Sequence, residues 1–225
     1  IILHLSLLEG IGPTAIARII SFLSLENLDR VYTLTHSDFV QGVGLSAKQT
    51  EKIMRGLTDT RLVDQELALI GEHKIAWALS HEDEYPALLK RIHLPPPVLF
   101  WRGKLPGLNS LAVVGSRDAN AYGCMAIDMI VPPLVQNQWA IVSGGARGAD
   151  TMAHKKTLEH NGVTVAVLGS GLLRPYPAEN KRLFQEIIEK GGALVSAFPA
   201  LMSPLAENFP ARNRVIAGLS RGCIV

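Results

Sequence analysis

The apolar side chains of the chain follow two different patterns. Across residues 1–75 they recur at helical spacing, as in residues 13–23, where Ile16, Ile19 and Leu23 fall on one face. From residue 111 onward, short and uniformly apolar runs alternate with amphipathic stretches; the runs are residues 111–114, 139–142, 163–168 and 193–195. The pattern predicts a helical first part and a second part in which strands and helices alternate.

The apolar runs are too uniform for strands that expose one face to water. Strands of this kind are typical of a parallel sheet that is covered by helices on both sides. Helices are expected between them at residues 120–131, 148–161 and 178–190, and Pro132 and Pro133 are expected to end or kink the first. The second part is therefore predicted to be α/β, a doubly wound and mostly parallel sheet with ligands at the carboxyl ends of its strands.

Residues 1–75 contain a weak internal repeat. Gly10-Ile11-Gly12 precedes the helix at residues 13–23, and Gly42-Val43-Gly44 precedes a second helix that begins with a capping box from Ser46 to Gln49. The arrangement resembles a pair of helix-hairpin-helix units, a small all-α module also called SAM-like. Its hairpin amides would suit a DNA phosphate, whereas its acidic character favours a scaffold or protein-contact role. The predicted domains are residues 1–75 and 76–225, joined through a connector around residues 71–110 in which residues 98–101 are strand-like.

Net charge divides the chain in the same way. The total of +2 combines 8 Lys and Arg against 12 Asp and Glu in residues 1–90 with 14 against 8 in residues 91–225. An anionic ligand is therefore expected on the second part. The 48% hydrophobic content excludes a disordered chain, no apolar run is long enough to span a membrane, and two distant cysteines indicate neither a disulfide framework nor a zinc site. A cytoplasmic location is expected.

Small residues follow three of the predicted strands. These segments are Gly115-Ser-Arg117, Ser143-Gly-Gly-Ala-Arg-Gly-Ala-Asp150 and Gly169-Ser-Gly171, and Phe209-Pro-Ala-Arg-Asn-Arg214 follows later. Glycine amides and helix N-termini suit phosphate, arginines bind it as forks, and an aromatic ring offers a base a stacking surface. A complete dinucleotide fingerprint and a Gly-Lys-Ser/Thr motif are absent from the sequence, which argues against NAD binding and ATP hydrolysis.

Six motifs together resemble the DNA-processing protein A family (DprA, also called Smf). They are Val113-Val-Gly-Ser-Arg117, the segment from Ser143 to Asp150, Ala153-His154, Ala166-Val-Leu-Gly-Ser-Gly-Leu172, Tyr176-Pro-x-x-Asn180 and Phe209-Pro-x-Arg-Asn-Arg-x-Ile-Ala-Gly-Leu-Ser220. The resemblance implies an extended Rossmann-like domain that binds and protects single-stranded DNA. It also implies a homodimer that helps to load the RecA recombinase in natural transformation, with no enzymatic activity, cofactor or metal.

Carried over by position, the resemblance implies a DNA site made of Gly115, Ser116, Arg117, Ser143, Gly144, Gly145, Ala146, Arg147, Gly148, Lys181, Phe209, Arg212, Asn213 and Arg214. Arg117 and either Arg212 or Arg214 are expected to contact phosphates. Gly144 and Gly145 are expected to donate amides, and Phe209 to pack against a base or sugar. The alternative for Arg214 is an internal ion pair with Asp150 or Glu207.

Several neighbouring residues fit less specific roles. His154 is expected on a helix surface or hydrogen-bonded in the core, Asp150 is expected to steady the start of the same helix, and Tyr176 is expected to pack or to line the groove. Leu173 and Ala197 stand where family members often carry acidic residues.

Two other functions remain open from the sequence. The glycine loops also fit a nucleotide phosphoribohydrolase of the lysine-decarboxylase-like fold, although residues 143–150 lack that motif's threonine and glutamate. The acidic helical part also fits a protein-binding adaptor. The terminal run at residues 222–225 suggests the start of another buried strand, so the chain is expected to be a fragment that a winged-helix domain follows in some family members.

Overall fold

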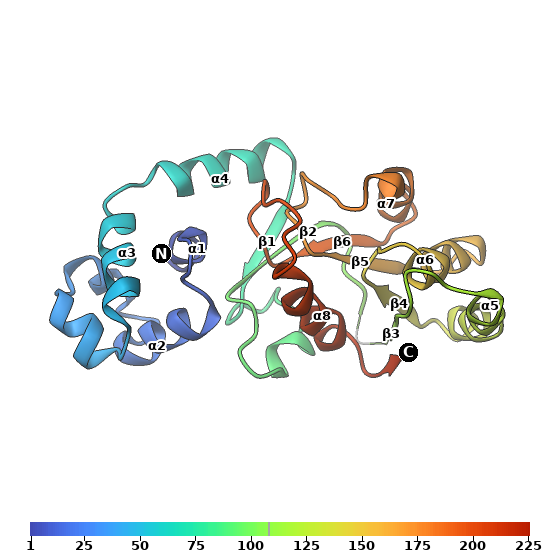
Figure 1. Cartoon of the computed structure of the whole chain (residues 1–225), viewed down its shortest axis with the longest axis horizontal. Coiled ribbons are helices and arrows are strands. Elements are labelled where there is room, and N and C mark those ends of the chain that lie inside the picture. Colours follow the sequence, from blue (N-terminus) through green and yellow to red (C-terminus); the bar gives the residue numbers. More distant parts are fainter. Residues whose placement is uncertain (108) are drawn as a thin grey trace.

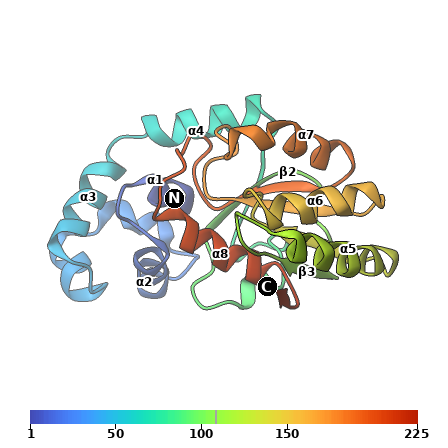
Figure 2. The same ribbon diagram turned by 45° about the vertical axis from the view of Figure 1, so that its right-hand side comes forward.

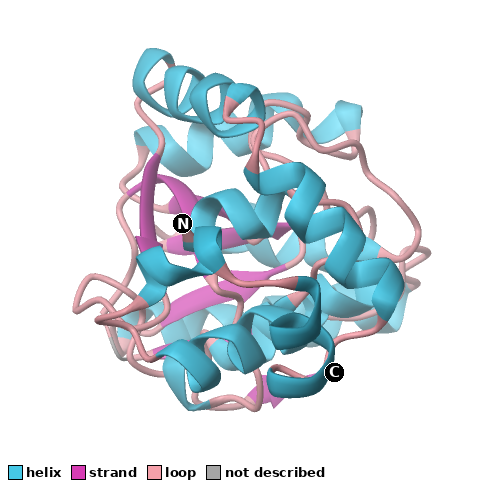
Figure 3. Ribbon diagram, turned by 90° about the vertical axis from the view of Figure 1, so that its left-hand side faces the viewer, coloured by secondary structure: helices cyan, strands magenta, loops and turns pink. Residues whose placement is uncertain are grey.

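The computed structural model describes residues 1–107 and 109–225 (Figure 1). Its first part consists of short helices: α1 (Ile2–Leu7), α2 (Pro13–Leu23), α3 (Ala47–Leu57) and α4 (Arg61–Glu72), with the short turns η1 (Leu28–Thr33) and η2 (Asp38–Gly42) between α2 and α3. From β1 (Ala76–Leu79) onward, strands and helices build a sheet domain. Seen from the side of the N-terminal helices, these helices lie in front of the strands (Figure 3).

Both predicted glycine turns precede helices. Gly10 and Gly44 have φ angles of 80° and 76°, which side chains rarely tolerate. Ser46 and Gln49 form the predicted capping box at the start of α3, so that prediction is confirmed. The guanidinium of Arg18 donates to the Gly44 carbonyl at 2.7 Å, and Lys52 donates to the Glu9 carbonyl at 3.0 Å. Each hairpin is thus held by a cation from the helix that follows the other hairpin.

The sheet confirms the predicted mostly parallel α/β fold. Within the described residues, its strands are ordered β1-β2-β6-β5-β4-β3-β7. The bounds are β2 (Val98–Gly103), β3 (Ser110–Val113), β4 (Ala140–Ser143), β5 (Thr164–Leu168), β6 (Ala193–Ser196) and β7 (Cys223–Ile224). Strands β3 to β7 pair in parallel, whereas β1 and β2 are antiparallel. The four apolar runs correspond to β3, β4, β5 and β6.

Helices cover both faces of the sheet (Figure 2). Their bounds are α5 (Ala121–Gln136), α6 (Ala149–Glu159), α7 (Lys181–Glu189) and α8 (Asn208–Gly218), with the short turns η3 (Leu89–Arg91) and η4 (Ala178–Asn180). Val113 and Ile141 pack with α5 and α6, whereas their strand neighbours Ala112 and Val142 pack with α8. Successive strand residues point to opposite faces, which explains why the runs had to be apolar throughout.

Two expectations from the sequence need correction. Helix α5 does not end at Pro132 and Pro133 but continues to Gln136. A proline inside a helix loses its N–H bond and crowds the carbonyl four residues earlier, but its φ is helical. The apolar neighbours Val131, Leu134 and Val135 keep this part of the helix packed. The 71–110 connector contains a strand of its own, β1, which pairs with β2. The expected terminal strand is present as β7, which pairs in parallel with β3.

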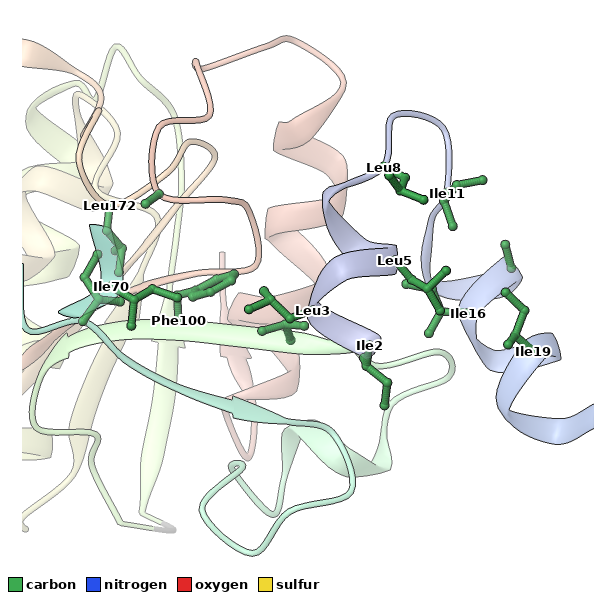
Figure 4. Packing of buried hydrophobic residues seen from close by; sticks show 14 of the residues in the cluster. Ile2, Leu3, Leu5, Leu8, Ile11, Ile16, Ile19, Ile70, Phe100 and Leu172 are labelled. Carbon is green, nitrogen blue, oxygen red and sulfur yellow. The ribbon is translucent and has the colours of Figure 1, made fainter. Parts of the chain in front are cut away.

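The helical part and the sheet share one hydrophobic cluster. Leu3 and Leu5 of α1 belong to the same cluster as Phe100 of β2 and Leu172 (Figure 4). The buried carboxylate of Glu66 on α4 also accepts a hydrogen bond from the Ala200 backbone at 2.7 Å. Burial raises the pKa of Glu66, and this hydrogen bond opposes the rise. The division into domains at residue 75 stays a prediction.

Among the described residues, none of the helices combines the length and the apolar character that a membrane span requires.

Candidate nucleic-acid interface

The candidate site lies where the order of the parallel strands reverses. From β3, the chain moves through β4, β5 and β6 on one side and then returns to place β7 on the other side. Crevices at the carboxyl ends of such strands are the usual ligand sites of doubly wound sheets. Here a cavity of about 460 Å³ opens between the end of β3 and helix α8. Its lining includes Gly115, Ser116, Arg117, Ala146, Phe209, Arg212 and Asn213.

Two arginines flank one aromatic ring beside this cavity. The guanidinium carbon of Arg117 lies 5.6 Å from the centroid of the Phe209 ring, and that of Arg212 lies 5.5 Å from it. Tyr176 meets the same ring edge-on, with centroids 6.3 Å apart. Arg117 is exposed, whereas Arg212 is only 6% exposed. The two arginines therefore have different surroundings and suit different tasks.

Arg212 is engaged inside the protein. Its Nη1 donates to the carbonyls of Gly144 and Val167, the latter at 2.8 Å, and its Nε donates to Asn213 at 3.1 Å. Burial lowers the pKa of Arg212, the Asp150 carboxylate raises it, and the Arg117 charge lowers it further. This guanidinium holds the glycine loop against the end of β5. Its predicted contact with phosphate stays a prediction.

Asp150 joins the loops that follow β3 and β4. Its Oδ2 accepts the Ala146 N–H at 3.2 Å, and the Gly115 N–H also bonds to the carboxylate. Burial raises the pKa of Asp150, while these hydrogen bonds and the Arg212 charge lower it. Asp150 thus steadies the loop that leads into α6, as expected, by holding backbone groups that precede the helix.

The loop from Ser143 to Gly148 depends on its glycines. Gly148 has a φ angle of 72°, and a Cβ there would overlap the Ser116 and Arg117 carbonyl oxygens. A Cβ on Gly144 would overlap Arg212 and Asp150, and one on Gly145 would overlap Phe184. Ser143 is fully buried and donates to the Val113 carbonyl at 2.7 Å, so its hydroxyl holds β4 to β3.

The other predicted site cations are Arg214, Lys181 and Arg147. Arg214 and Arg147 have partners within the protein, and Lys181 lies outside the cavity lining. Arg214 donates to the carbonyls of His93 and Leu94. It points away from Arg212, because residues two positions apart on a helix point in nearly opposite directions. The alternative prediction for Arg214, an ion pair with Asp150 or Glu207, does not correspond to these contacts. Lys181 is exposed at the start of α7 and does not line the cavity. Arg147 is exposed and pairs with Glu179 at 3.4 Å. The predicted DNA contacts of all three stay predictions.

The sequence motif from Tyr176 to Asn180 contributes more than was expected of it. Tyr176 and Pro177 line a small hollow with Arg117, Gly144 and Phe209. The Asn180 amide donates to the Gly145 carbonyl at 2.9 Å and to the Thr151 hydroxyl at 2.7 Å. The sequence signal for this supporting role was the Tyr-Pro-x-x-Asn motif, which occurs in the same chain as the glycine-rich loop after β4.

Leu173 and Ala197 stand where family members often carry acidic residues. Both are partly buried and pack against the hydrophobic clusters.

His154 lies in the core below the glycine loop. It is fully buried, and its Nδ1 is 2.7 Å from the Thr164 hydroxyl, which itself donates to the Ile141 carbonyl. Since that hydroxyl has given its proton away, Nδ1 must carry the hydrogen. The prediction of a hydrogen-bonded core histidine is confirmed.

This histidine should make the protein sensitive to acid. Burial, aided by the Arg212 charge, lowers the pKa of His154 to about 3, below its ordinary value of 6.5. Between these two pH values the unfolded chain binds the proton and the folded chain does not, so stability falls as pH falls, by up to about 1.4 kcal/mol per pH unit. His154→Asn keeps a neutral donor and should remove this part of the slope. Urea unfolding from pH 7 to pH 4.5 measures it, and equal slopes for both proteins would exclude the histidine as the cause.

The fold and the site together define an α/β protein with a glycine- and arginine-lined hollow at the reversal point of its parallel sheet. The family model of DNA recombination-mediator protein A matches residues 76–225, and the chain belongs to this family.

Curated relatives agree with this assignment. Protein Smf of Escherichia coli (strain K12) is 38% identical over 195 residues, which cover 85% of this chain and 52% of that protein. DNA processing protein DprA of Streptococcus pneumoniae is 43% identical over 146 residues, covering 64% of this chain and 51% of that protein. The chain thus spans about half the length of these curated relatives.

Two solved structures are similar to the whole chain or to most of it. The X-ray structure of DNA processing protein A from Streptococcus pneumoniae has a TM-score of 0.78 and 32% identity, covering all of this chain and 75% of that one. A structure of DNA processing protein A from Helicobacter pylori, described for its single-stranded DNA binding mode, has a TM-score of 0.57 and 27% identity. It covers 65% of this chain and 70% of that one.

Proposed function

We propose that this chain binds single-stranded DNA, without catalysis, at the hollow between the end of β3 and helix α8. The observation that carries the proposal is the exposed Arg117 guanidinium, 5.6 Å from the centroid of the Phe209 ring, in the lining of the cavity between the end of β3 and α8. An arginine fork suits a phosphate, and a neighbouring aromatic ring suits a base. The family relationship and the Helicobacter pylori protein's described binding mode support the same ligand.

The aromatic rings favour a single strand over a duplex. Phe209 is half-buried and Tyr176 is 43% exposed, and the two rings meet edge-on. Bases stack on such rings only when they are not already stacked and paired in a double helix. Little base-specific readout is expected, because every base offers a flat π face.

The further parts of the proposal concern the larger process. We propose that the protein protects incoming DNA and helps to load the RecA recombinase during natural transformation, in the cytoplasm and as a homodimer. We also propose that residues 1–75 form a SAM-like helix-hairpin-helix domain and residues 76–225 the DNA-binding domain. The acidic balance of residues 1–90, 8 Lys and Arg against 12 Asp and Glu, favours a protein-contact role for the first domain.

Removal of the Arg117 guanidinium is expected to weaken binding about tenfold, because a charge-assisted phosphate contact and the stack on Phe209 are lost together. Fluorescence anisotropy of a labelled oligo-dT strand measures the affinity of Arg117→Ala. Arg55→Ala removes the same charge from an exposed position on α3 and serves as the matched control. An Arg117→Ala protein that binds as tightly as the Arg55→Ala protein would contradict the assignment of this site.

The enzyme alternative has a direct test of its own. A nucleotide phosphoribohydrolase would release ribose 5-phosphate from nucleoside monophosphates. We expect no release above a heat-treated control, and release that depends on the native protein would contradict the proposal of a protein without catalytic activity.

A further inference from the structure

The glycine loop after β4 is held from behind by side chains from three separate elements. The carbonyl of Gly144 accepts from Arg212 on α8, and that of Gly145 accepts from Asn180 of η4 at 2.9 Å. The carbonyl of Ala146 accepts from the Thr151 hydroxyl of α6 at 2.6 Å and from the Thr151 backbone N–H at 3.1 Å. Three successive carbonyls are therefore bound by the protein itself.

The last of these carbonyls determines the direction of an amide. In a trans peptide unit the N–H points opposite to the C=O. Since the Ala146 carbonyl faces the first turn of α6, the Arg147 N–H points out from the start of that helix. Ala146 and Arg147 both line the small hollow that also contains Arg117 and Phe209. A rotated peptide unit would instead present a carbonyl oxygen there, which repels an anion.

Asn180 is central to this arrangement. It is only 7% exposed, and its amide Nδ2 donates to both the Gly145 carbonyl and the Thr151 hydroxyl. The Thr151 hydroxyl in turn donates to Ala146, so one chain of hydrogen bonds runs from Asn180 to the peptide unit that faces the hollow. The neighbouring Glu179 pairs with the Arg147 side chain, and Tyr176 of the same segment contacts Phe209.

We infer that Asn180, acting through Thr151, is a positioning residue that orients the peptide unit between Ala146 and Arg147 so that the Arg147 N–H, and not the Ala146 carbonyl, faces an anionic ligand. The inference rests on the proposed function for the identity of that ligand, the phosphate of a single DNA strand. Asn180 itself is buried behind the loop and holds the backbone instead of the DNA.

The test compares two substitutions that remove a hydrogen-bond donor with a third, Thr151→Ser, that keeps it. Asn180→Asp keeps the shape of the side chain but replaces its donor with an acceptor, and Thr151→Val keeps the branched shape but removes the hydroxyl. Both are expected to weaken oligo-dT binding about tenfold as the loop relaxes, because Asn180→Asp removes the donor to the Gly145 carbonyl and Thr151→Val removes one of the two donors to the Ala146 carbonyl. Thr151→Ser retains the hydroxyl and is expected to bind like the unchanged protein. Asn137→Asp, which removes a similar amide-to-carbonyl bond at the end of α5, is the matched control.

Hydrogen exchange separates this inference from the proposed function. Without DNA, the Ala146 amide, which donates to Asp150 within the same loop, should exchange at least about tenfold faster in Asn180→Asp and Thr151→Val than in Thr151→Ser or Asn137→Asp. Unchanged loop exchange in the first two variants would overturn the positioning role, whatever the DNA affinity. Thr151→Ser behaving like Thr151→Val would overturn it as well. An unchanged protein that binds no oligo-dT, with loop exchange as expected, would instead overturn the proposed function.

Discussion

Arg212→Ala is expected to lower the free energy of unfolding by about 3 to 5 kcal/mol, the usual effect of removing one partner from a buried charged network. Arg212 is buried, donates to the carbonyls of Gly144 and Val167, and supplies a positive charge that lowers the pKa of Asp150. Without it two buried carbonyls lose their donor, and the Asp150 carboxylate keeps its burial without the opposing charge. Urea denaturation followed by circular dichroism measures the change.

The same variant should respond to pH in a defined direction. Burial already raises the pKa of Asp150, and the Arg212 charge counteracts that rise. Removal of the charge raises the pKa of Asp150 further. A carboxyl whose pKa is raised by folding loses its stabilising effect as pH rises through the folded-state pKa, so the destabilisation should be larger near pH 8 than near pH 5.

Two controls define the result. Arg117→Ala changes the other arginine at the Phe209 ring, which is exposed, and should alter stability by no more than about 0.5 kcal/mol. Arg212→Lys should recover only part of the loss, because an ammonium group lacks the planar fork that reaches two carbonyls. Equal stability of the Arg212→Ala and Arg117→Ala proteins would show that the buried network has been assigned incorrectly.

Gly148→Ala is expected to destabilise the protein by about 3 kcal/mol or more and to displace the end of β3. The residue has a φ angle of 72°, which an L side chain rarely adopts, and an added Cβ would overlap the carbonyl oxygens of Ser116 and Arg117. Those oxygens belong to the backbone and cannot move without shifting the loop that carries Arg117. The change should therefore weaken DNA binding as well as stability.

A second glycine separates backbone strain from overlap. Gly191 has a φ angle of 83°, but an added Cβ there has no heavy atom within 4 Å. Gly191→Ala should cost only about 1 kcal/mol, from the left-handed backbone alone. Thermal unfolding of both variants measures the difference, and similar losses would mean that the contact between the two loops does not matter.

The sequence predicted the central sheet well, because strands that are buried on both faces appear in the sequence as short apolar runs. Strands covered on both sides are mostly apolar, and β3, β4, β5 and β6 have that property. Their buried exceptions carry hydroxyl groups that donate to backbone carbonyls: Ser110, Ser143, Thr164 and Ser196. Strand β1 was not predicted, although residues 75–79 are also an apolar run; it lies at the edge of the sheet and has partly exposed positions. Pro132 and Pro133 misled the helix prediction, since tertiary packing of α5 outweighs a local preference.

The sequence predicted which segments form the site, but it did not predict the contacts that each arginine makes there. Glycine-rich strand ends indicated the cavity, yet Arg117, Arg212 and Arg214 are indistinguishable by residue type. Helix geometry directs Arg212 inward and Arg214 toward the carbonyls of residues 93 and 94, whereas Arg117 stays exposed beside the cavity. Such differences depend on which neighbours the fold brings within hydrogen-bonding distance, and only the tertiary structure supplies them.

The central claim, that this chain holds the phosphates of a single DNA strand at the end of its sheet, is tested most directly by the salt dependence of oligo-dT binding. Anisotropy titrations at 50 and 200 mM salt should show an affinity that falls about tenfold, because two or three phosphate contacts release counterions when the strand binds. A duplex of the same length should bind more weakly at both salt concentrations. Binding of oligo-dT that is absent, or that is unchanged between the two salt concentrations, would contradict the account.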